Sequence, residues 1–238
     1  MLEQLLSGGR PRVDAVILYI DMATLTETIE GRPVVVTNGA AIDNAFLIDG
    51  KPTLRMPTGG ATGPRLRINF APAFNLSTTN WTIEWSVHYV VAPGVWTNEL
   101  FFTEPTYYRG FQLRFADSGW DGMLMFADNA LGNNSSARVD LRPAGLAGKL
   151  NRYAVTNKGG KIRFFINGQP TDVSPGLAVN GLPPRSEFEV QSLSNFAGLT
   201  ELNMGGFSDY AVNSSRYLGN VRISNYVRYN TNYIPDVV

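Results

Sequence analysis

One stretch of the chain places three chemically reactive residue types on one face of an expected strand. In NWTIEWSVHYVV, residues 80–91, Glu84, Ser86 and His88 alternate with large apolar residues. This two-residue alternation predicts a β-strand with one buried apolar face and one polar face. A carboxylate, a hydroxyl and an imidazole are residue types that hydrolytic enzymes use as acids, bases and nucleophiles.

The spacing of these residues argues against catalysis. A glycosidase needs two carboxyl groups that flank the scissile bond. The positions two and four residues after Glu84 hold Ser86 and His88 instead of carboxylates. His88 is the only histidine, which excludes a HExxH zinc site, and no Gly-x-Ser-x-Gly elbow occurs. We therefore expect no catalytic residue and no enzyme activity, and we interpret Glu84 as a solvent-facing or cross-strand partner.

Composition narrows the classes of protein further. The 238 residues carry a net charge of +0, so the basic excess of a nucleic-acid binder is absent. The chain has no cysteine, which excludes disulfides and thiolate metal sites. No apolar run approaches the roughly 20 residues of a membrane span, and the first residues lack the apolar core of a signal peptide. We expect a globular protein that is made in a bacterial-type cytoplasm and binds neither nucleic acid nor membrane.

Strand signals fill the chain from Val13 onward. Residues 152–170, RYAVTNKGGKIRFFINGQP, are typical of a β-hairpin that turns at Lys158-Gly159-Gly160. Further strands are expected in residues 15–21, 32–39, 45–57 (two strands about Asp49-Gly50), 65–71, 99–104, 111–117, 122–128, 199–206 and 217–229. Strands at intervals of about 8 to 12 residues favour one antiparallel sandwich domain, residues 13–238. Residues 170–197 contain three further prolines and are interpreted mostly as a loop.

The N-terminal residues 1–12 form a separate short arm in this interpretation. Leu2, Leu5 and Leu6 have the spacing of one helical turn, and Ser7-Gly8-Gly9 ends it. Two alternatives remain for the arm. It is either a frayed terminus or an anchor that docks its leucines on a partner protein.

Four stretches of the sequence resemble the laminin-G-like, concanavalin-A-like jelly-roll family, in the form common in bacteriophage virion proteins. Residues 15–21 are similar to the first strand of that family, and residues 74–89 are similar to its T-I-E-containing strand. Residues 150–169 resemble its hairpin. Residues 205–235, with VRISNYVRYNTNYIP, resemble its last strand and carry the most specific motif. The resemblance implies an all-β fold, a two-sheet antiparallel jelly-roll sandwich.

The resemblance also implies a function. We expect a non-enzymatic virion structural protein, a capsid decoration or cementing protein that contacts the major capsid protein or the tail as a homo-oligomer. The alternative is a lectin-like tail or surface protein that binds a host glycan.

Two kinds of site are candidates for this function. Trp96, Tyr107, Tyr108 and Trp120 lie in or beside expected loops and are the candidate binding aromatics. They either cap the core or form a shared binding surface. Many members of the family that the chain resembles hold calcium through Asp and Asn oxygens, and Asp117, Asp121, Asp128 and Asn129 are of these types. They form no DxDxDG run, so we expect no cofactor and assign no metal ligand, with bound calcium as the alternative.

Overall fold

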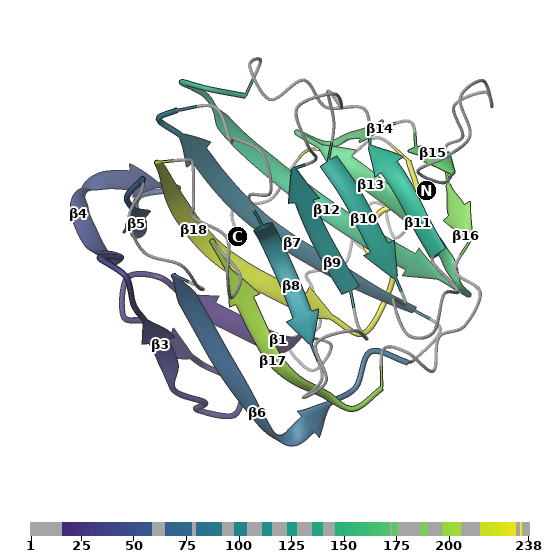
Figure 1. Cartoon of the computed structure of the whole chain (residues 1–238), viewed down its shortest axis with the longest axis horizontal. Coiled ribbons are helices and arrows are strands. Elements are labelled where there is room, and N and C mark those ends of the chain that lie inside the picture. The colour runs from purple at the N-terminus through teal and green to yellow at the C-terminus, as the bar shows by residue number, and fades with distance from the viewer. Residues whose placement is uncertain are drawn as a thin grey trace, which may run out of the picture.

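The protein is an all-β sandwich of two antiparallel sheets (Figure 1). The computed structural model describes residues 16–58, 65–77, 80–91, 98–103, 111–115, 123–127, 135–139, 146–171, 173–175, 187–189, 197–205, 215–231 and 234. Within these ranges the regular secondary structure consists of strands, and no helix is long and apolar enough to cross a membrane. The predicted fold class is confirmed.

Sheet A contains both the first and the last strand of the described chain, and they lie side by side. Its main order is β14-β13-β12-β7-β18-β1-β2; β16 adds to β13, and the β4–β5 hairpin adds to β18. The strands are β1 (Val16–Asp21), β2 (Thr26–Glu27), β4 (Ala41–Ile48), β5 (Lys51–Met56), β7 (Asn80–Tyr89), β12 (Leu150–Lys158), β13 (Lys161–Ile166), β14 (Gln169–Thr171), β16 (Phe188–Glu189) and β18 (Arg216–Ser224).

Sheet B covers one face of sheet A. Its order is β15-β11-β10-β9-β8-β17-β6-β3. The strands are β3 (Val34–Val36), β6 (Leu66–Phe74), β8 (Asn98–Thr103), β9 (Phe111–Phe115), β10 (Met123–Ala127), β11 (Ser135–Val139), β15 (Val173–Pro175) and β17 (Leu199–Met204). In Figure 1 strands β6, β17 and β8 to β11 lie in front of β1, β18, β7 and β12.

Two hairpins turn at the residues where the sequence predicts a turn. Asp49 and Gly50 both have positive φ angles, 56° and 75°, as do Gly159 and Gly160, 61° and 90°. Two consecutive residues with positive φ match the twist of the flanking strands, which is why short hairpins favour Asp-Gly and Gly-Gly. Both predicted hairpins, β4–β5 and β12–β13, are confirmed.

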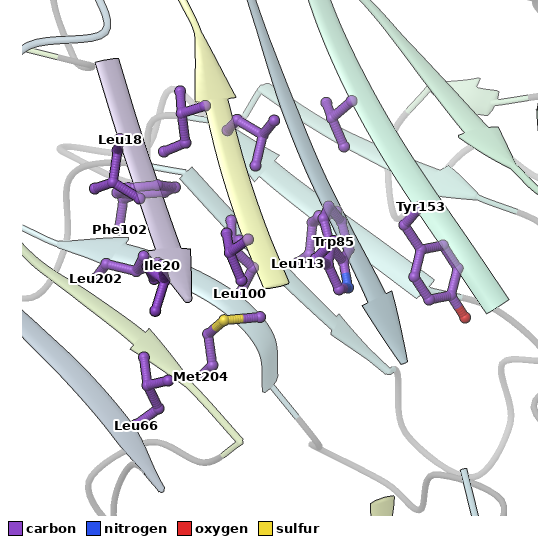
Figure 2. Close-up of a cluster of buried hydrophobic side chains, with 14 of the residues drawn as sticks. Leu18, Ile20, Leu66, Trp85, Leu100, Phe102, Leu113, Tyr153, Leu202 and Met204 are labelled. Carbon is purple, nitrogen blue, oxygen red and sulfur yellow. The ribbon is translucent and has the colours of Figure 1, made fainter. Parts of the chain in front are cut away.

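The hydrophobic core lies between the two sheets (Figure 2). The predicted apolar face of β7 is confirmed from Trp81 to Tyr89, because Trp81, Ile83, Trp85, Val87 and Tyr89 all have 0% exposure, whereas Val91, beyond the end of the strand, is 50% exposed. In Figure 2 the ring of Trp85 lies between Tyr153 of the same sheet, 5.2 Å away between ring centroids, and Leu113 of sheet B. A core of this size supplies the main stabilising term of the fold, and the chain has no cysteine with which to form disulfides.

One expectation about exposure is wrong. β7 is buried on its second face too, where Thr82, Glu84 and Ser86 have at most 2% exposure. The reason is that this outer face of sheet A, the face turned away from sheet B, is covered by the β4–β5 hairpin and by residues 225–231. Residues 170–197 were predicted to be mostly a loop; those that the structure describes include parts of three short strands, β14, β15 and β16, and most of the others lie outside the described ranges.

Candidate functional site

Glu84 is the centre of a buried charge network on the outer face of sheet A. Arg222 lies directly opposite it on the neighbouring strand β18. The Nε and Nη2 groups of Arg222 donate to the two carboxylate oxygens of Glu84, at 2.9 and 3.0 Å. This two-bond geometry is the strongest form of an arginine–carboxylate pair. The pair joins β7 to β18 at the middle of the sheet.

The segment after β18 closes over the same carboxylate. Arg228 Nη1 donates to Glu84 Oε2 at 2.9 Å, and the hydroxyl of Tyr229 donates to Glu84 Oε1 at 2.5 Å. Thr82 fixes the backbone of this segment, because its hydroxyl donates to the carbonyl of Tyr226 at 2.8 Å and accepts from the amide of Arg228 at 3.0 Å. Residues 225–231 therefore form a strap across the outer face.

The strap also has an apolar contact with the sheet. Tyr229 packs with Ala154 of β12 and Phe165 of β13 in a small second cluster of buried side chains. The rings of Phe165 and Tyr229 meet edge to face, with centroids 6.2 Å apart. Arg163 donates to the backbone carbonyl of Asn230. The strap thus ties β7, β12, β13 and β18 together.

This arrangement assigns Glu84 a structural position. A glycosidase carboxylate must reach its substrate and face a second carboxyl about 5 to 10 Å away. Glu84 is 2% exposed, and among the described residues the charged side chains that contact it are two arginines. The prediction of a solvent-facing Glu84 is wrong, whereas the alternative of a cross-strand partner is confirmed. A buried charge needs this surrounding set of donors, since removal from water costs several kcal/mol.

The residues that carry the sequence resemblance meet in this network. Thr82 and Glu84 belong to the T-I-E motif of residues 74–89, while Arg222, Arg228 and Tyr229 belong to the closing motif of residues 205–235. The motifs thus encode the attachment of the strap to the sheet. The attachment of the strap explains why Thr82, Glu84 and Arg222 are polar although β7 and β18 are otherwise largely apolar.

A second buried ion pair lies inside the sandwich, between the sheets. Arg216 of β18 donates to Glu99 of β8, and both side chains have 1% exposure. The register of β8 against β9 shifts between Asn98 and Leu100. A bulge at this point re-aims a side chain, which explains how Glu99 faces the interior beside apolar Leu100. Burial raises the pKa of Glu99, and the charge of Arg216 opposes that shift.

Two tyrosines of sheet A surround this pair. Tyr89 of β7 and Tyr153 of β12 have 0% and 1% exposure. Burial raises the pKa of both hydroxyls, and the negative charge of Glu99 raises it further. The cluster fixes one end of β8 against β18. Sequence reasoning missed it, although a signal exists: Arg216 occupies an inward position in the alternating pattern of β18.

His88 lies on the outer face beside aromatic neighbours. It stands opposite Tyr217 of β18, and the ring of Phe46 from β4 packs 4.8 Å from it. Phe46 also stacks on Tyr217, with centroids 4.0 Å apart and an angle of 9° between the rings. His88 is half-buried, in keeping with the prediction of an ordinary strand residue. No catalytic partner contacts it in the described part of the chain.

The other predicted site residues lie outside the described residues. These are the candidate aromatics Trp96, Tyr107, Tyr108 and Trp120, and the leucines of the arm, Leu2, Leu5 and Leu6. The same holds for residues 117–122 and 128–134, the acidic turns weighed for calcium. Among the residues that are described, no group of three or more His, Cys, Asp or Glu side chains could hold a metal ion.

The fold is similar to that of several solved structures. The binding domain of Paraclostridial Mosquitocidal Protein 1 superposes with a TM-score of 0.61 at 10% identity, over 91% of this chain and 50% of that one. The botulinum neurotoxin serotype D ligand-binding domain, solved in complex with N-acetylneuraminic acid, gives 0.61 at 12% identity, over 91% and 48%. A botulinum neurotoxin type C structure, from work on cell entry that depends on two ganglioside molecules, gives 0.60 at 11%, over 91% and 49%.

The comparisons in sequence give a different result from those in structure. No protein-family model matches the chain, and no curated protein matches it in sequence. This chain spans about half the length of the toxin domains that it matches in structure. At 10 to 12% identity the likeness identifies the fold alone: the chain has the two-sheet β-sandwich found in clostridial toxin binding domains.

Proposed function

We propose that this chain is a non-catalytic recognition domain that binds a glycan. The observation that carries the proposal is the environment of Glu84. The one carboxylate on the strand where hydrolysis was considered is enclosed by Arg222, Arg228 and Tyr229. Its charge serves the attachment of the strap, so the domain acts through its surface and not through bond cleavage.

The solved relatives support the choice of a glycan. Two of the toxin domains with this fold are described with sugar ligands, a ganglioside in one case and N-acetylneuraminic acid in the other. β-Sandwiches present loops and sheet faces on a rigid scaffold, which suits recognition of an extended ligand. The candidate aromatics Trp96, Tyr107, Tyr108 and Trp120 would stack on sugar rings.

The test combines a binding assay with an assay for hydrolysis. The fluorescently labelled full chain is applied to an array of neutral and acidic glycans, and the release of reducing ends from β-glucans is measured in parallel. We expect specific binding and no hydrolysis. Hydrolysis by the wild type would overturn the non-catalytic proposal, and a chain that binds no glycan would overturn the recognition proposal.

A second candidate is a structural protein of a bacteriophage virion, located in the virion and made in the bacterial cytoplasm. It would decorate a capsid as a homo-oligomer that contacts the major capsid protein, or it would form part of the tail. The favouring observation is that the phage-type sequence motifs meet in one network, at Thr82, Glu84, Arg222, Arg228 and Tyr229. The residues that carry the resemblance therefore act together to attach the strap to sheet A.

Truncation of the arm tests this second candidate. Deletion of residues 1–9 should leave the domain folded, because β1 begins at Val16 and the described core begins at Leu18. The melting temperature should stay unchanged while co-sedimentation with virus particles falls. Full attachment without residues 1–9 would show that Leu2, Leu5 and Leu6 are not an anchor. Absence of the full-length chain from particles would remove the virion role.

A further inference from the structure

A row of four residues crosses four neighbouring strands on the outer face of sheet A. Arg55 of β5 pairs with Tyr217 of β18, Tyr217 pairs with His88 of β7, and His88 pairs with Leu150 of β12. Three strand spacings of roughly 4.8 Å make the row about 14 Å long. We call these four residues the outer row. The strap covers a different part of the same face, over Glu84 and Phe165.

The outer row offers an accessible apolar surface. Tyr217, His88 and Leu150 are half-buried, and Phe46 stacks on Tyr217 while remaining half-buried itself. Val90, which follows the end of β7 two residues after His88, is 48% exposed. Aromatic rings and aliphatic side chains held in place by a sheet present a fixed surface at little cost in conformational entropy.

Two unpaired cations flank this surface. Arg55 at one end of the outer row and Lys149, beside Leu150 at the other end, are both exposed. Among the described residues neither side chain has a hydrogen bond or ion pair. Other cations near the row are engaged, because Arg152 pairs with Asp49 and Lys51 donates to the hydroxyl of Tyr19 at 2.9 Å. The surface is therefore complementary to an acidic ligand.

We propose that the outer row binds an acidic oligosaccharide. The apolar faces of two or three sugar rings would lie on Phe46, Tyr217 and Val90, and a sugar carboxylate would accept two hydrogen bonds from the guanidinium of Arg55. The inference rests on the proposed glycan-binding function and names its site and ligand class. A protein partner fits less well, because a stable protein interface buries about 800 Å² on each side, far more than a row of this length.

Titration of the full-length chain with 3′-sialyllactose and with neutral lactose tests the proposal. Binding is measured by ligand-observed NMR and calorimetry. We expect the acidic sugar to bind more tightly than lactose. Its affinity should fall as the salt concentration rises. Arg55→Gln should weaken binding about tenfold and Lys149→Gln about threefold. Lys158→Gln is the matched control, since Lys158 is an exposed cation at the opposite end of β12 and should have no effect.

Each other outcome has a distinct meaning. If sialyllactose or another array glycan binds and Arg55→Gln changes nothing, the site assignment is overturned while glycan recognition stands. If the wild type binds no glycan at all, both proposals fail. If a polyglutamate peptide binds with the same dependence on Arg55 while sialyllactose does not bind, the row takes an acidic peptide and the oligosaccharide assignment is wrong. Because Arg55, Lys149 and Lys158 are all exposed, their replacement should not disturb the fold. Unchanged melting temperatures of the three variants will verify this.

Discussion

Tyr229 donates a 2.5 Å hydrogen bond to Glu84 across 145 positions of the sequence. Arg222 and Arg228 reach the same carboxylate from 138 and 144 positions away. The side chain of Glu84 on β7 thus contacts both the last described strand and the strap that follows it, in addition to the strand pairing and the hydrogen bonds of Thr82. This connection makes the stability of the whole sheet dependent on Glu84.

Glu84→Gln should lower the free energy of unfolding by about 3–5 kcal/mol. The amide keeps the size of the side chain but leaves two buried guanidinium groups without a counter-charge, which is costlier than loss of the pair itself. Urea denaturation followed by fluorescence measures the change. Glu30→Gln is the control: Glu30 is exposed and pairs with Arg32, so its loss should cost no more than about 0.5 kcal/mol. Equal effects in the two variants would contradict a central role for Glu84.

Trp81 and Trp85 should respond differently to replacement by phenylalanine. Both rings are 0% exposed on the same face of β7. The Nε1 of Trp81 donates to the carbonyl of Leu76 at 3.0 Å, whereas the Nε1 of Trp85 has no hydrogen-bond partner among the residues described. Trp81→Phe should therefore destabilise the domain by about 1–3 kcal/mol more than Trp85→Phe.

Thermal unfolding of the two variants measures this difference. Trp85→Ala provides the scale, with an expected loss of about 3–5 kcal/mol for removal of a buried aromatic side chain. If Trp85→Phe proved the more destabilising of the two phenylalanine variants, the packing of the Trp85 ring would contribute more to stability than the hydrogen bond of Trp81 does.

Stability should fall steeply in alkaline solution because of Tyr153. Burial raises the pKa of its hydroxyl above the ordinary value of 10.0, as it does for Tyr89. The folded state keeps the proton of the Tyr153 hydroxyl, while the unfolded chain releases it near pH 10. The stabilisation from this hydroxyl is therefore complete below pH 10 and is lost as the pH rises further. The expected slope is about 1.4 kcal/mol per pH unit for each such tyrosine.

Tyr153→Phe isolates this contribution. Phenylalanine cannot ionise, so the variant should lose stability less steeply between pH 10 and 11 than the wild type does. Denaturant titrations at several pH values give both slopes. Parallel curves would mean that the hydroxyl of Tyr153 reaches solvent in the folded state.

The sequence predicted what depends on short-range pattern. Alternation from Trp81 to Tyr89 identified the inward face of β7, and Asp49-Gly50 and Gly159-Gly160 located two hairpins, because these signals involve neighbouring residues. A two-residue period says which residues share a face but not what covers that face. For this reason the sequence left Glu84 as either a solvent-facing residue or a cross-strand partner, and it did not identify the counter-charges of Glu84.

The interior ion pair was hidden from the sequence for a related reason. Glu99 reaches the core because β8 shifts register between Asn98 and Leu100, and a bulge leaves no dependable mark in an alternating pattern. Its partner Arg216 lies 117 positions away on the other sheet. The outer row likewise requires the pairing order of β5, β18, β7 and β12, which only the fold provides.

Gly205→Ala should destabilise the domain far more than Gly198→Ala. The two glycines flank β17 and have similar positive φ angles, 80° and 71°, so an alanine at either position costs about 1 kcal/mol in backbone strain. A Cβ on Gly198 meets nothing within 4 Å. A Cβ on Gly205 would lie 2.7 Å from the sulfur of Met56 and 3.0 Å from Cβ of Arg65.

These contacts decide the expected difference. Met56 has 0% exposure and Arg65 has 1%, so neither side chain has free space into which it can move, and Cβ of Arg65 is fixed by the backbone. Overpacking of this kind adds about 1–3 kcal/mol. Chemical denaturation of both variants provides the comparison. Equal losses would show that the ends of β5 and β17 separate easily, whereas the expected larger loss at Gly205 means that sheets A and B are held in close contact there.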